Sequence, residues 1–245
     1  MAGFALAACC PTATPPSTVS ADPSGSSDSQ QRAPTTDAWR QAREELADLR
    51  ARFAPRRART LHVKLAMEHG PTGRRLEARG AVAVGRHDAL RMILLGPGGT
   101  TALDLWVCGD DYRYVVPALD MQRRGRVDDV DEGSGGFPVA FLRWWFLERL
   151  EGRLLSFGDD GSTRDFVLRH RGRVLRVRGG GDLSVSRDEE TLTAEGGDCG
   201  HARYHHAGLG LTVDVVCERV DEGRPPSRAF ADPDAPERAC EAEGA

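Results

Sequence analysis

The sequence has few aromatic residues, no apolar run long enough to cross a membrane and no excess of basic charge. Aromatic residues make up only 6% of the 245 residues, so a local aromatic cluster stands out. A membrane-spanning helix needs roughly 20 consecutive apolar residues, and none of that length occurs. With 33 Lys and Arg against 37 Asp and Glu, the formal net charge is −4. The sequence therefore lacks the excess of positive charge that is typical of proteins that bind nucleic acid.

The motifs of the common catalytic machineries are also missing. We find no nucleophile elbow, no Walker loop, no HExxH helix and no Rossmann glycine fingerprint. The glycine-rich segment GPGGT (96–100) joins two expected strands and opens no helix, so it cannot aim helix amides at a phosphate. The six cysteines include no CxxC pair. The sequence therefore favours a protein that is not an enzyme and that uses no metal and no cofactor.

The densest cluster of aromatic residues lies in one segment, FPVAFLRWWFLERL (137–150). Pro138 suits a first helical turn, and Gly152 follows the last apolar residue. At helical spacing the apolar side chains cover most of the circumference, which is typical of a helix buried on more than one side. Such a helix would span about 20 Å, too short to cross a membrane. We predict a core or lid helix lying against a sheet.

The N-terminal region has the organisation of a membrane-anchored protein. Residues 6–9, Leu-Ala-Ala-Cys, resemble the lipobox of bacterial lipoproteins, which implies a truncated signal over 1–9 and lipidation of Cys9. No Lys or Arg precedes Cys9, in contrast to an ordinary signal, and a chance tetrapeptide is the alternative. Residues 10–36 are rich in Pro, Ser and Thr and carry too little apolar surface to fold, so we expect a disordered tether.

The spacing of apolar residues then changes from helical to strand-like. It predicts an amphipathic helix over 37–53, with Asp37 as the N-cap. From residue 60 the period is two, which predicts antiparallel strands separated by short turns. Small residues on the buried face, such as Ala78 and Gly80, favour a curved sheet. The expected strands are 61–67, 76–84, 90–94, 101–108, 112–116, 118–125, 153–157, 164–170, 173–178, 182–186, 191–195, 199–206 and 211–220.

Two polar segments lie outside this pattern. The acidic loop 126–136 lacks the order of ligands that an EF-hand calcium loop requires, so we interpret it as a solvated loop. Residues 221–245 are rich in Pro, Ala and acidic residues, and we expect a flexible tail. No second core is apparent, so the sequence predicts one folded domain over 37–220.

Cys199 and Cys217 lie nine residues on either side of Gly208, in a predicted hairpin. A symmetric register would bring their Cα atoms to roughly 4.5–5.5 Å, which is compatible with a disulfide. Two separate buried thiols are the alternative. A disulfide would favour an oxidising compartment. His201 and His205 would share a face with Cys199, but their spacing matches no standard zinc motif, so half-exposed strand histidines are the preferred interpretation.

The order of these elements resembles that of the LolA/LolB-like lipoprotein-carrier superfamily. The segment LHVKLAMEHG (61–70) and the strands that follow it to Pro117 look like the opening strands of that family. The resemblance covers residues 37–220. It implies a mainly β (α+β) fold: a single antiparallel, strongly curved, half-open β-barrel of about 11 strands, with an N-terminal helix and a central lid or plug helix.

The resemblance also implies a binding function without covalent chemistry. The half-barrel would take the acyl chains of a lipid or an acylated lipoprotein in an apolar cavity and serve lipid or lipoprotein localisation. It implies a monomer in the bacterial envelope, anchored through Cys9 to the outer membrane and facing the periplasm, with no nucleic-acid partner. The cavity and lid residues would be Leu65, Met67, Leu76, Val82, Met92, Leu94, Phe141, Trp144 and Trp145.

Two other functions are compatible with the sequence. The half-barrel can have a filled interior and serve as an envelope-assembly scaffold lipoprotein. Alternatively, His201 and His205 can belong to a metal-dependent hydrolase. The interior of the β domain distinguishes the first two readings, because a carrier needs an empty apolar volume under 137–150.

Overall fold

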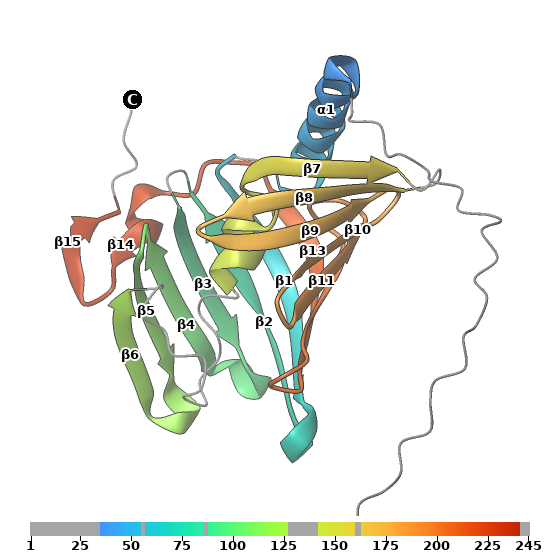
Figure 1. Ribbon diagram of the computed structural model, residues 1–245. Coiled ribbons are helices and arrows are strands. Elements are labelled where there is room, and N and C mark those ends of the chain that lie inside the picture. Colours follow the sequence, from blue (N-terminus) through green and yellow to red (C-terminus); the bar gives the residue numbers. More distant parts are fainter. Residues whose placement is uncertain (1–34, 55–56, 86–87, 127–141, 160–162, 241–245) are drawn as a thin grey trace, which may run out of the picture. The chain divides into compact units, whose positions relative to one another are not determined.

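The fold is described from a computed structural model of the chain (Figure 1). The structure describes residues 35–54, 57–85, 88–126, 142–159 and 163–240. Cys9, nearly all of the tether and the acidic loop from residue 127 onward lie outside the described residues. The chain divides into two units, residues 1–35 and 36–245. The second unit contains every helix and strand discussed below.

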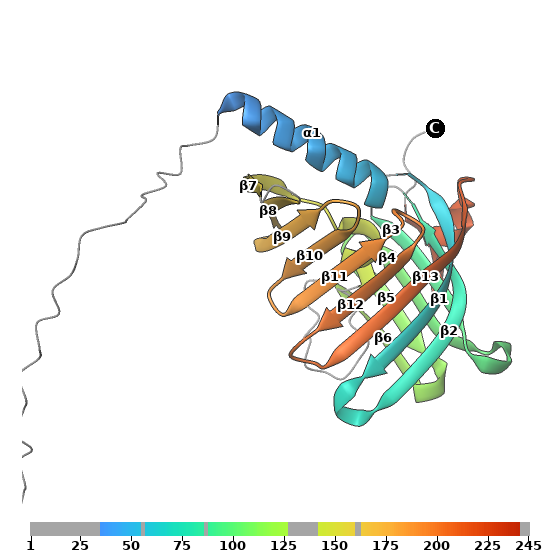
Figure 2. The same cartoon turned by 90° about the vertical axis from the view of Figure 1, so that its right-hand side faces the viewer.

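The second unit is built on one antiparallel sheet of 13 strands, in the order β6-β5-β4-β3-β2-β1-β13-β12-β11-β10-β9-β8-β7 (Figures 1 and 2). The predicted curved, half-open β architecture is confirmed, but the sheet has 13 strands and not about 11. Two meanders, β1 to β6 and β7 to β13, meet where β1 pairs with β13, and β6 and β7 form the open edges. The strands are β1 (Arg59–His69), β2 (Arg74–Val84), β3 (Ala89–Leu95), β4 (Thr101–Cys108), β5 (Asp111–Val116), β6 (Met121–Arg126), β7 (Arg153–Asp159), β8 (Arg164–His170), β9 (Arg173–Gly179), β10 (Leu183–Arg187), β11 (Glu190–Glu195), β12 (His201–His206) and β13 (Leu211–Asp221).

Glycine shapes this sheet at two positions. The β8–β9 hairpin turns at Arg171 and Gly172, which both have positive φ (45° and 80°), the backbone that a tight two-residue hairpin needs. Gly80 faces the interior from β2, and a Cβ atom there would overlap the backbone carbonyl of Ile93. The missing side chain therefore lets β3 approach β2 closely where the sheet curves.

The N-terminal helix α1 (Thr36–Phe53) packs against the second meander (Figure 2). Its buried residues are Ala42, Leu46, Leu49 and Phe53, at the helical spacing predicted from the sequence. Trp39 meets Phe157 of β7 edge to face, with ring centroids 5.0 Å apart. These contacts place α1 on the same face of the sheet as the main core.

The prediction of a flexible tail after residue 220 is wrong for the described part of that segment. A 3₁₀ turn (Ser227–Phe230) leads into a short hairpin of β14 (Ala231–Asp232) and β15 (Ala235–Ala239). Phe230 is buried in a second hydrophobic cluster, and its carbonyl accepts a hydrogen bond from the Trp106 indole at 2.8 Å. A disulfide joins Cys240 to Cys108 of β4. Sequence composition missed this segment because a covalent link and ion pairs hold it, with little apolar burial.

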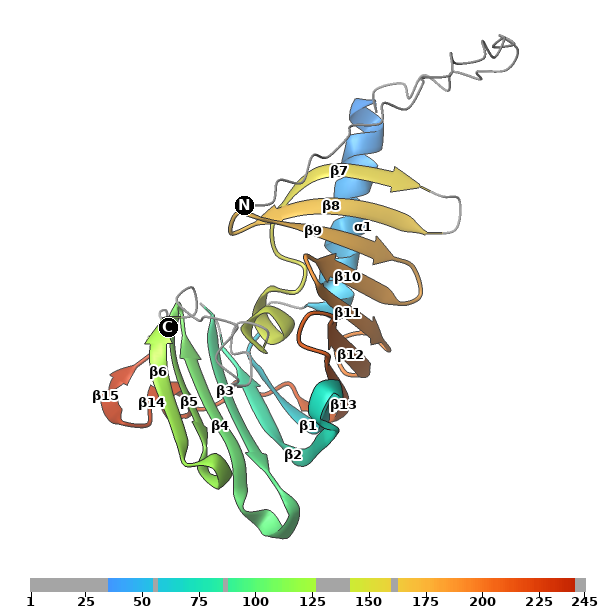
Figure 3. The ribbon, with the colours of Figure 1, turned by 60° about the horizontal axis from the view of Figure 1, so that its bottom comes forward.

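The central helix is described from residue 142 to residue 150. Trp144–Glu148 is a π-helical segment, a form that occurs mostly in single turns and frequently at functional sites. Figure 3 shows it between the two meanders. Among the described helices, none combines the length and apolar character that a membrane crossing requires.

Candidate functional site

The inner face of the first meander carries the predicted lining. Leu65, Val82, Met92 and Leu94 are all buried in the main core, because alternate residues of β1, β2 and β3 point to the same side. Met67 is partly buried and packs against this cluster. The structure therefore brings these five residues together on the face that carries the central helix.

Two other predicted lining residues are not part of that group. Leu76 is 36% exposed, because it lies near the start of β2, opposite Met67 and beyond the buried part of the face. Phe141 lies outside the described residues. Leu76 therefore lies outside the main core cluster that the other predicted strand residues join.

The two tryptophans of the central helix fill the centre of the domain. Trp144 and Trp145 are each 1% exposed and belong to the main hydrophobic core. The Arg187 guanidinium lies 4.3 Å from the centre of the Trp144 ring, a cation–π contact. Tyr204 meets Trp144 edge to face at 6.4 Å. The Trp144 indole nitrogen is buried and has no hydrogen-bond partner among the described residues, which leaves an unused polar group in the core.

The space beneath the helix is small in this conformation. One pocket borders Trp145, Phe146 and Arg149 of the helix and Leu61 and Val63 of β1. Its volume is about 20 Å³, enough for about one water molecule. Among the described residues, the helix side chains therefore fill this part of the inner face, and the pocket beside them is too small for an acyl chain.

A cluster of charged residues fixes the start of the helix. Arg143 is buried and contacts Asp110 at 2.9 Å, Asp88 at 3.3 Å and Glu148 at 3.0 Å. Asp110 precedes β5 and Asp88 precedes β3, so this one side chain ties the helix to two loops of the first meander. The hydrogen bond from Arg143 is the main cause that holds the pKa of Asp110 below its ordinary value.

Glu148 makes the matching connection to the second meander. Its carboxylate lies 3.2 Å from His170 and 3.3 Å from Arg171, both at the β8–β9 turn. Burial raises the pKa of Glu148, but the contact with His170 and the charges of Arg143 and Arg171 outweigh burial and lower it. The carboxylate is therefore held ionised, and the helix is bound to both meanders through its charged residues.

The end of the helix is held by a second set of contacts. Arg50 of α1 donates hydrogen bonds to the carbonyls of Leu150 at 3.0 Å and Gly152 at 2.8 Å. Arg149 is buried and donates to the Trp145 carbonyl at 2.8 Å. Burial lowers the pKa of Arg149 to about 10. These bonds satisfy carbonyls at the helix end that have no partner within the helix.

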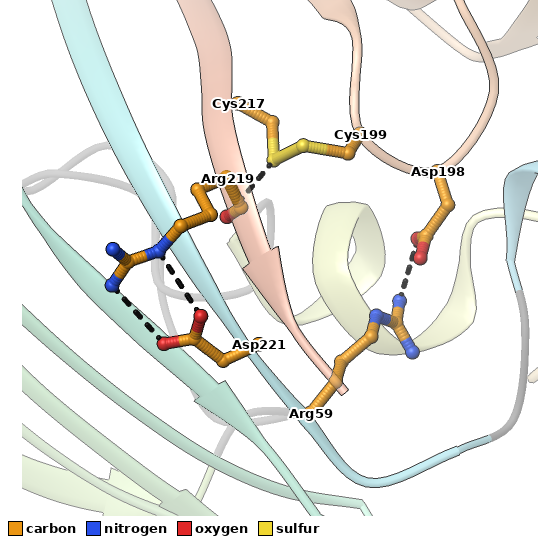
Figure 4. The surroundings of a disulfide bond; sticks show 6 residues. All are labelled: Arg59, Asp198, Cys199, Cys217, Arg219 and Asp221. Carbon is orange, nitrogen blue, oxygen red and sulfur yellow. Dashed lines mark hydrogen bonds and ion pairs between the residues drawn. A yellow bond between two sulfur atoms is a disulfide. The ribbon is translucent and has the colours of Figure 1, made fainter. Parts of the chain in front are cut away.

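Next to this helix end, the buried Arg59 forms an ion pair of 2.8 Å with the partly buried Asp198 (Figure 4). Burial raises the pKa of Asp198, and the positive charges of Arg59 and Arg149 offset only part of that rise. One Asp198 oxygen has no hydrogen-bond partner among the described residues. Because Asp198 and Arg149 both border the pocket of about 20 Å³, a water molecule there would satisfy that oxygen.

The structure joins Cys199 to Cys217 in a disulfide, with Cα atoms 4.9 Å apart (Figure 4). The pair Cys108–Cys240 was not anticipated, because 132 residues separate the two cysteines and no local pattern marks them. The histidines beside Cys199 have their own partners. His201 lies 3.1 Å from Asp214, and His205 lies 3.2 Å from the Thr212 hydroxyl. Within the described ranges, no group of three His, Cys, Asp or Glu side chains is placed to hold a metal.

No protein-family model matches the sequence, and no curated protein matches it. Comparison of structures does find matches. A LolA superfamily protein from Nitrosomonas europaea is 12% identical, with a TM-score of 0.52 over 78% of this chain and 97% of that chain. A DUF1329 family protein from Desulfovibrio piger is 13% identical, with a TM-score of 0.48 over 78% and 95% of the two chains. A domain from Vibrio parahaemolyticus, named for a proposed role in outer-membrane lipoprotein sorting, is 12% identical, with a TM-score of 0.47 over 72% and 90%. The match to the Nitrosomonas europaea protein shows that the chain has a LolA-like fold.

Proposed function

We propose that this LolA-like domain holds the acyl chains of a lipid or an acylated lipoprotein against its inner face, without covalent chemistry. The observation that carries this proposal is that the helix tryptophans belong to the same hydrophobic core cluster as the predicted lining residues. These lining residues are Leu65, Val82, Met92 and Leu94. An acyl chain that takes the place of Trp144 and Trp145 would meet the same apolar surface. In this account the central helix is a displaceable plug.

The energies of such an exchange are balanced. Each buried tryptophan covers roughly 150–250 Å², so exposing Trp144 and Trp145 costs on the order of 10 kcal/mol at about 25 cal/mol per Å². An acyl chain of about 14 methylenes gains about 11 kcal/mol on leaving water, at about 0.8 kcal/mol each. The two values are close, so binding and release are both accessible without an external source of energy. Charged contacts at the helix ends then set which state is favoured.

The same proposal places the protein in the bacterial envelope. The disulfides Cys108–Cys240 and Cys199–Cys217 are typical of an oxidising compartment. A lipidated Cys9 and the tether 10–36 would hold the domain at the outer membrane, facing the periplasm. Labelled palmitate should enter the full chain in bacterial cells and should be absent from Cys9→Ser. Equal palmitate labelling of the parent chain and of Cys9→Ser would show that Cys9 is not the lipidated residue.

A scaffold role is the second candidate function, and one observation favours it. The pocket beneath the helix holds only about 20 Å³, and the buried contacts of Arg143 and Glu148 are costly to break. A helix that never leaves the inner face would make the domain a filled half-barrel. It would then present only its surfaces to other envelope proteins.

Lipid extraction and hydrogen exchange separate the two functions. For a carrier, mass spectrometry of the purified full chain detects bound lipid, and a fluorescent acyl probe binds at one saturable site. Backbone amides of 142–150 then exchange by local opening, faster than the amides of β1 and β13. A scaffold gives no bound lipid, no saturable probe binding, and exchange of 142–150 only with global unfolding.

A further inference from the structure

The outer face of β7, β8 and β9 carries a row of arginines. Arg153 pairs directly with Arg169 across β7 and β8, and Arg169 pairs with Val174 across β8 and β9. Directly opposed residues of an antiparallel pair lie on one face. Arg176 faces the same side, two residues along β9 from Val174. All three arginines are exposed.

These three arginines have no carboxylate within ion-pairing distance in the described parts of the chain, whereas neighbouring arginines are paired. Arg164 contacts Glu45 at 2.7 Å, and Arg178 contacts Asp165 at 3.0 Å. Like charges directly opposite one another in a sheet are destabilising, so the Arg153 and Arg169 pair costs stability in the isolated domain. An external anion would relieve that repulsion.

Two apolar residues lie among the arginines. Leu155 is 42% exposed at a register shift in β7, and Val174 is 48% exposed on β9. We call Arg153, Leu155, Arg169, Val174 and Arg176 the basic outer face. Arginines interleaved with exposed aliphatic side chains match the boundary of an anionic bilayer, where charges meet head groups and apolar side chains enter the acyl region. The net charge of −4 argues against a nucleic-acid partner.

The described helices leave this face uncovered. α1 contacts the opposite side of the same strands, through Phe157 of β7 and the space beside Gly179 of β9. The central helix lies on that inner side as well, since Phe166 and Leu175 belong to the same core as its tryptophans. Figure 2 shows α1 running along the ends of these strands. The basic outer face is therefore free to meet a flat surface while the inner face stays packed.

We propose that the basic outer face binds the head groups of anionic phospholipids and orients the domain on a bilayer. The surface is separate from the inner-face site of the proposed function. A domain held in this way would keep β7 near the lipid surface.

The test is a vesicle-binding measurement on the full chain with Cys9→Ser, so that no lipid anchor contributes. Vesicles of phosphatidylcholine with about 30 mol % phosphatidylglycerol should bind the chain, and pure phosphatidylcholine vesicles should not. An arginine near an anionic surface contributes a factor of roughly five in affinity. The variant Arg153→Gln/Arg169→Gln/Arg176→Gln should therefore lose about 100-fold. Binding should also weaken at about 1 M salt, where the Debye length falls to about 3 Å.

A matched variant separates local charge from net charge. Arg74→Gln/Arg224→Gln/Arg228→Gln removes the same charge from exposed positions elsewhere and should change binding less than about threefold. Thermal melting of both variants confirms that they fold. Equal losses in the two triple variants, binding that ignores phosphatidylglycerol, or tighter binding to DNA than to vesicles would overturn the proposal. Acyl-probe binding at the inner face should be the same in all three chains, which keeps this test independent of the carrier function.

Discussion

The guanidinium of Arg143 on the central helix lies 2.9 Å from the carboxylate of Asp110, in the turn between β4 and β5. The same side chain contacts Glu148, whose carboxylate reaches Arg171 at the β8–β9 turn. Through these contacts, one short helix connects the two meanders of an open sheet. These ion pairs fix the central helix to both meanders, and in the proposed carrier they would control access to the inner face.

Replacing Arg143 should destabilise the domain strongly. Arg143→Met leaves the buried Glu148 with fewer partners, and removing one member of a buried ion pair costs roughly 3–5 kcal/mol. Urea unfolding measures the change. Arg40→Met is the matched control, because Arg40 and Asp37 form an exposed pair on α1 that is worth about 1 kcal/mol or less. Similar losses in both variants would mean that the Arg143 contacts do not hold the plug.

Gly80→Ala should disrupt the curvature of the sheet. Its Cβ would overlap the Ile93 carbonyl, and neither backbone can move without breaking ladder hydrogen bonds. We expect a loss of more than about 3 kcal/mol or a failure to fold. Gly158→Ala in β7 is the control, since nothing lies within 4 Å of a Cβ there. A stable, well-folded Gly80→Ala chain would contradict the close approach of β2 and β3.

The disulfide Cys108–Cys240 should contribute more stability than Cys199–Cys217. It closes a loop with a sequence separation of 132 residues, against 18 for the other pair. In the chain-entropy model, loops of these sizes correspond to about 5 and about 3 kcal/mol. Cys108→Ser/Cys240→Ser and Cys199→Ser/Cys217→Ser, compared by urea unfolding, measure both values. Non-reducing peptide mapping should recover the two pairings, and any other pairing would refute this arrangement.

Asp232 should make the C-terminal hairpin sensitive to acid. The Arg124 hydrogen bonds, at 2.6 and 2.7 Å, lower the pKa of Asp232 from 3.8 to about 2. Because the folded pKa lies below the unfolded one, the stabilisation is present above about pH 4 and is lost as pH falls through about 2. It amounts to roughly 2 kcal/mol.

Unfolding of Asp232→Asn between pH 5 and 2 measures this contribution, and the variant should show a shallower loss of stability than the parent chain. Asp48→Asn, on the exposed side of α1, should leave the pH profile unchanged. Parallel profiles for Asp232→Asn and the parent chain would show that the Arg124 contact does not stabilise the fold.

Periodicity was enough to predict the strands of the large sheet and α1. Every segment with period two is a strand, because alternate burial leaves a direct trace in the sequence. Leu65, Val82, Met92 and Leu94 could be assigned to one face for the same reason. The period does not indicate how far the core extends along a strand. The predicted cavity lining therefore included Leu76, which is exposed.

Long-range pairings left no trace in the sequence. The contacts of Arg143 with Asp88 and Asp110 join residues that only the curvature of the sheet brings together. The link from Cys240 to Cys108 depends on a β14–β15 hairpin that composition predicts as tail. Whether the helix acts as a lid or a plug also could not be predicted, since apolar residues on all sides are compatible with both.

Fluorescence of the helix tryptophans during acyl-chain binding tests the carrier account most directly. The chain has four tryptophans, so Trp39→Phe/Trp106→Phe leaves only Trp144 and Trp145 to emit. A displaced plug predicts saturable quenching by a brominated acyl chain and a shift of the emission to longer wavelength. The variant Arg143→Met, made in this background, should bind the brominated acyl chain more tightly, because its central helix is held by fewer ion pairs. The account would be contradicted if a saturating concentration of the acyl chain neither quenched the tryptophan emission nor changed its wavelength. The helix would then be a permanent part of the core.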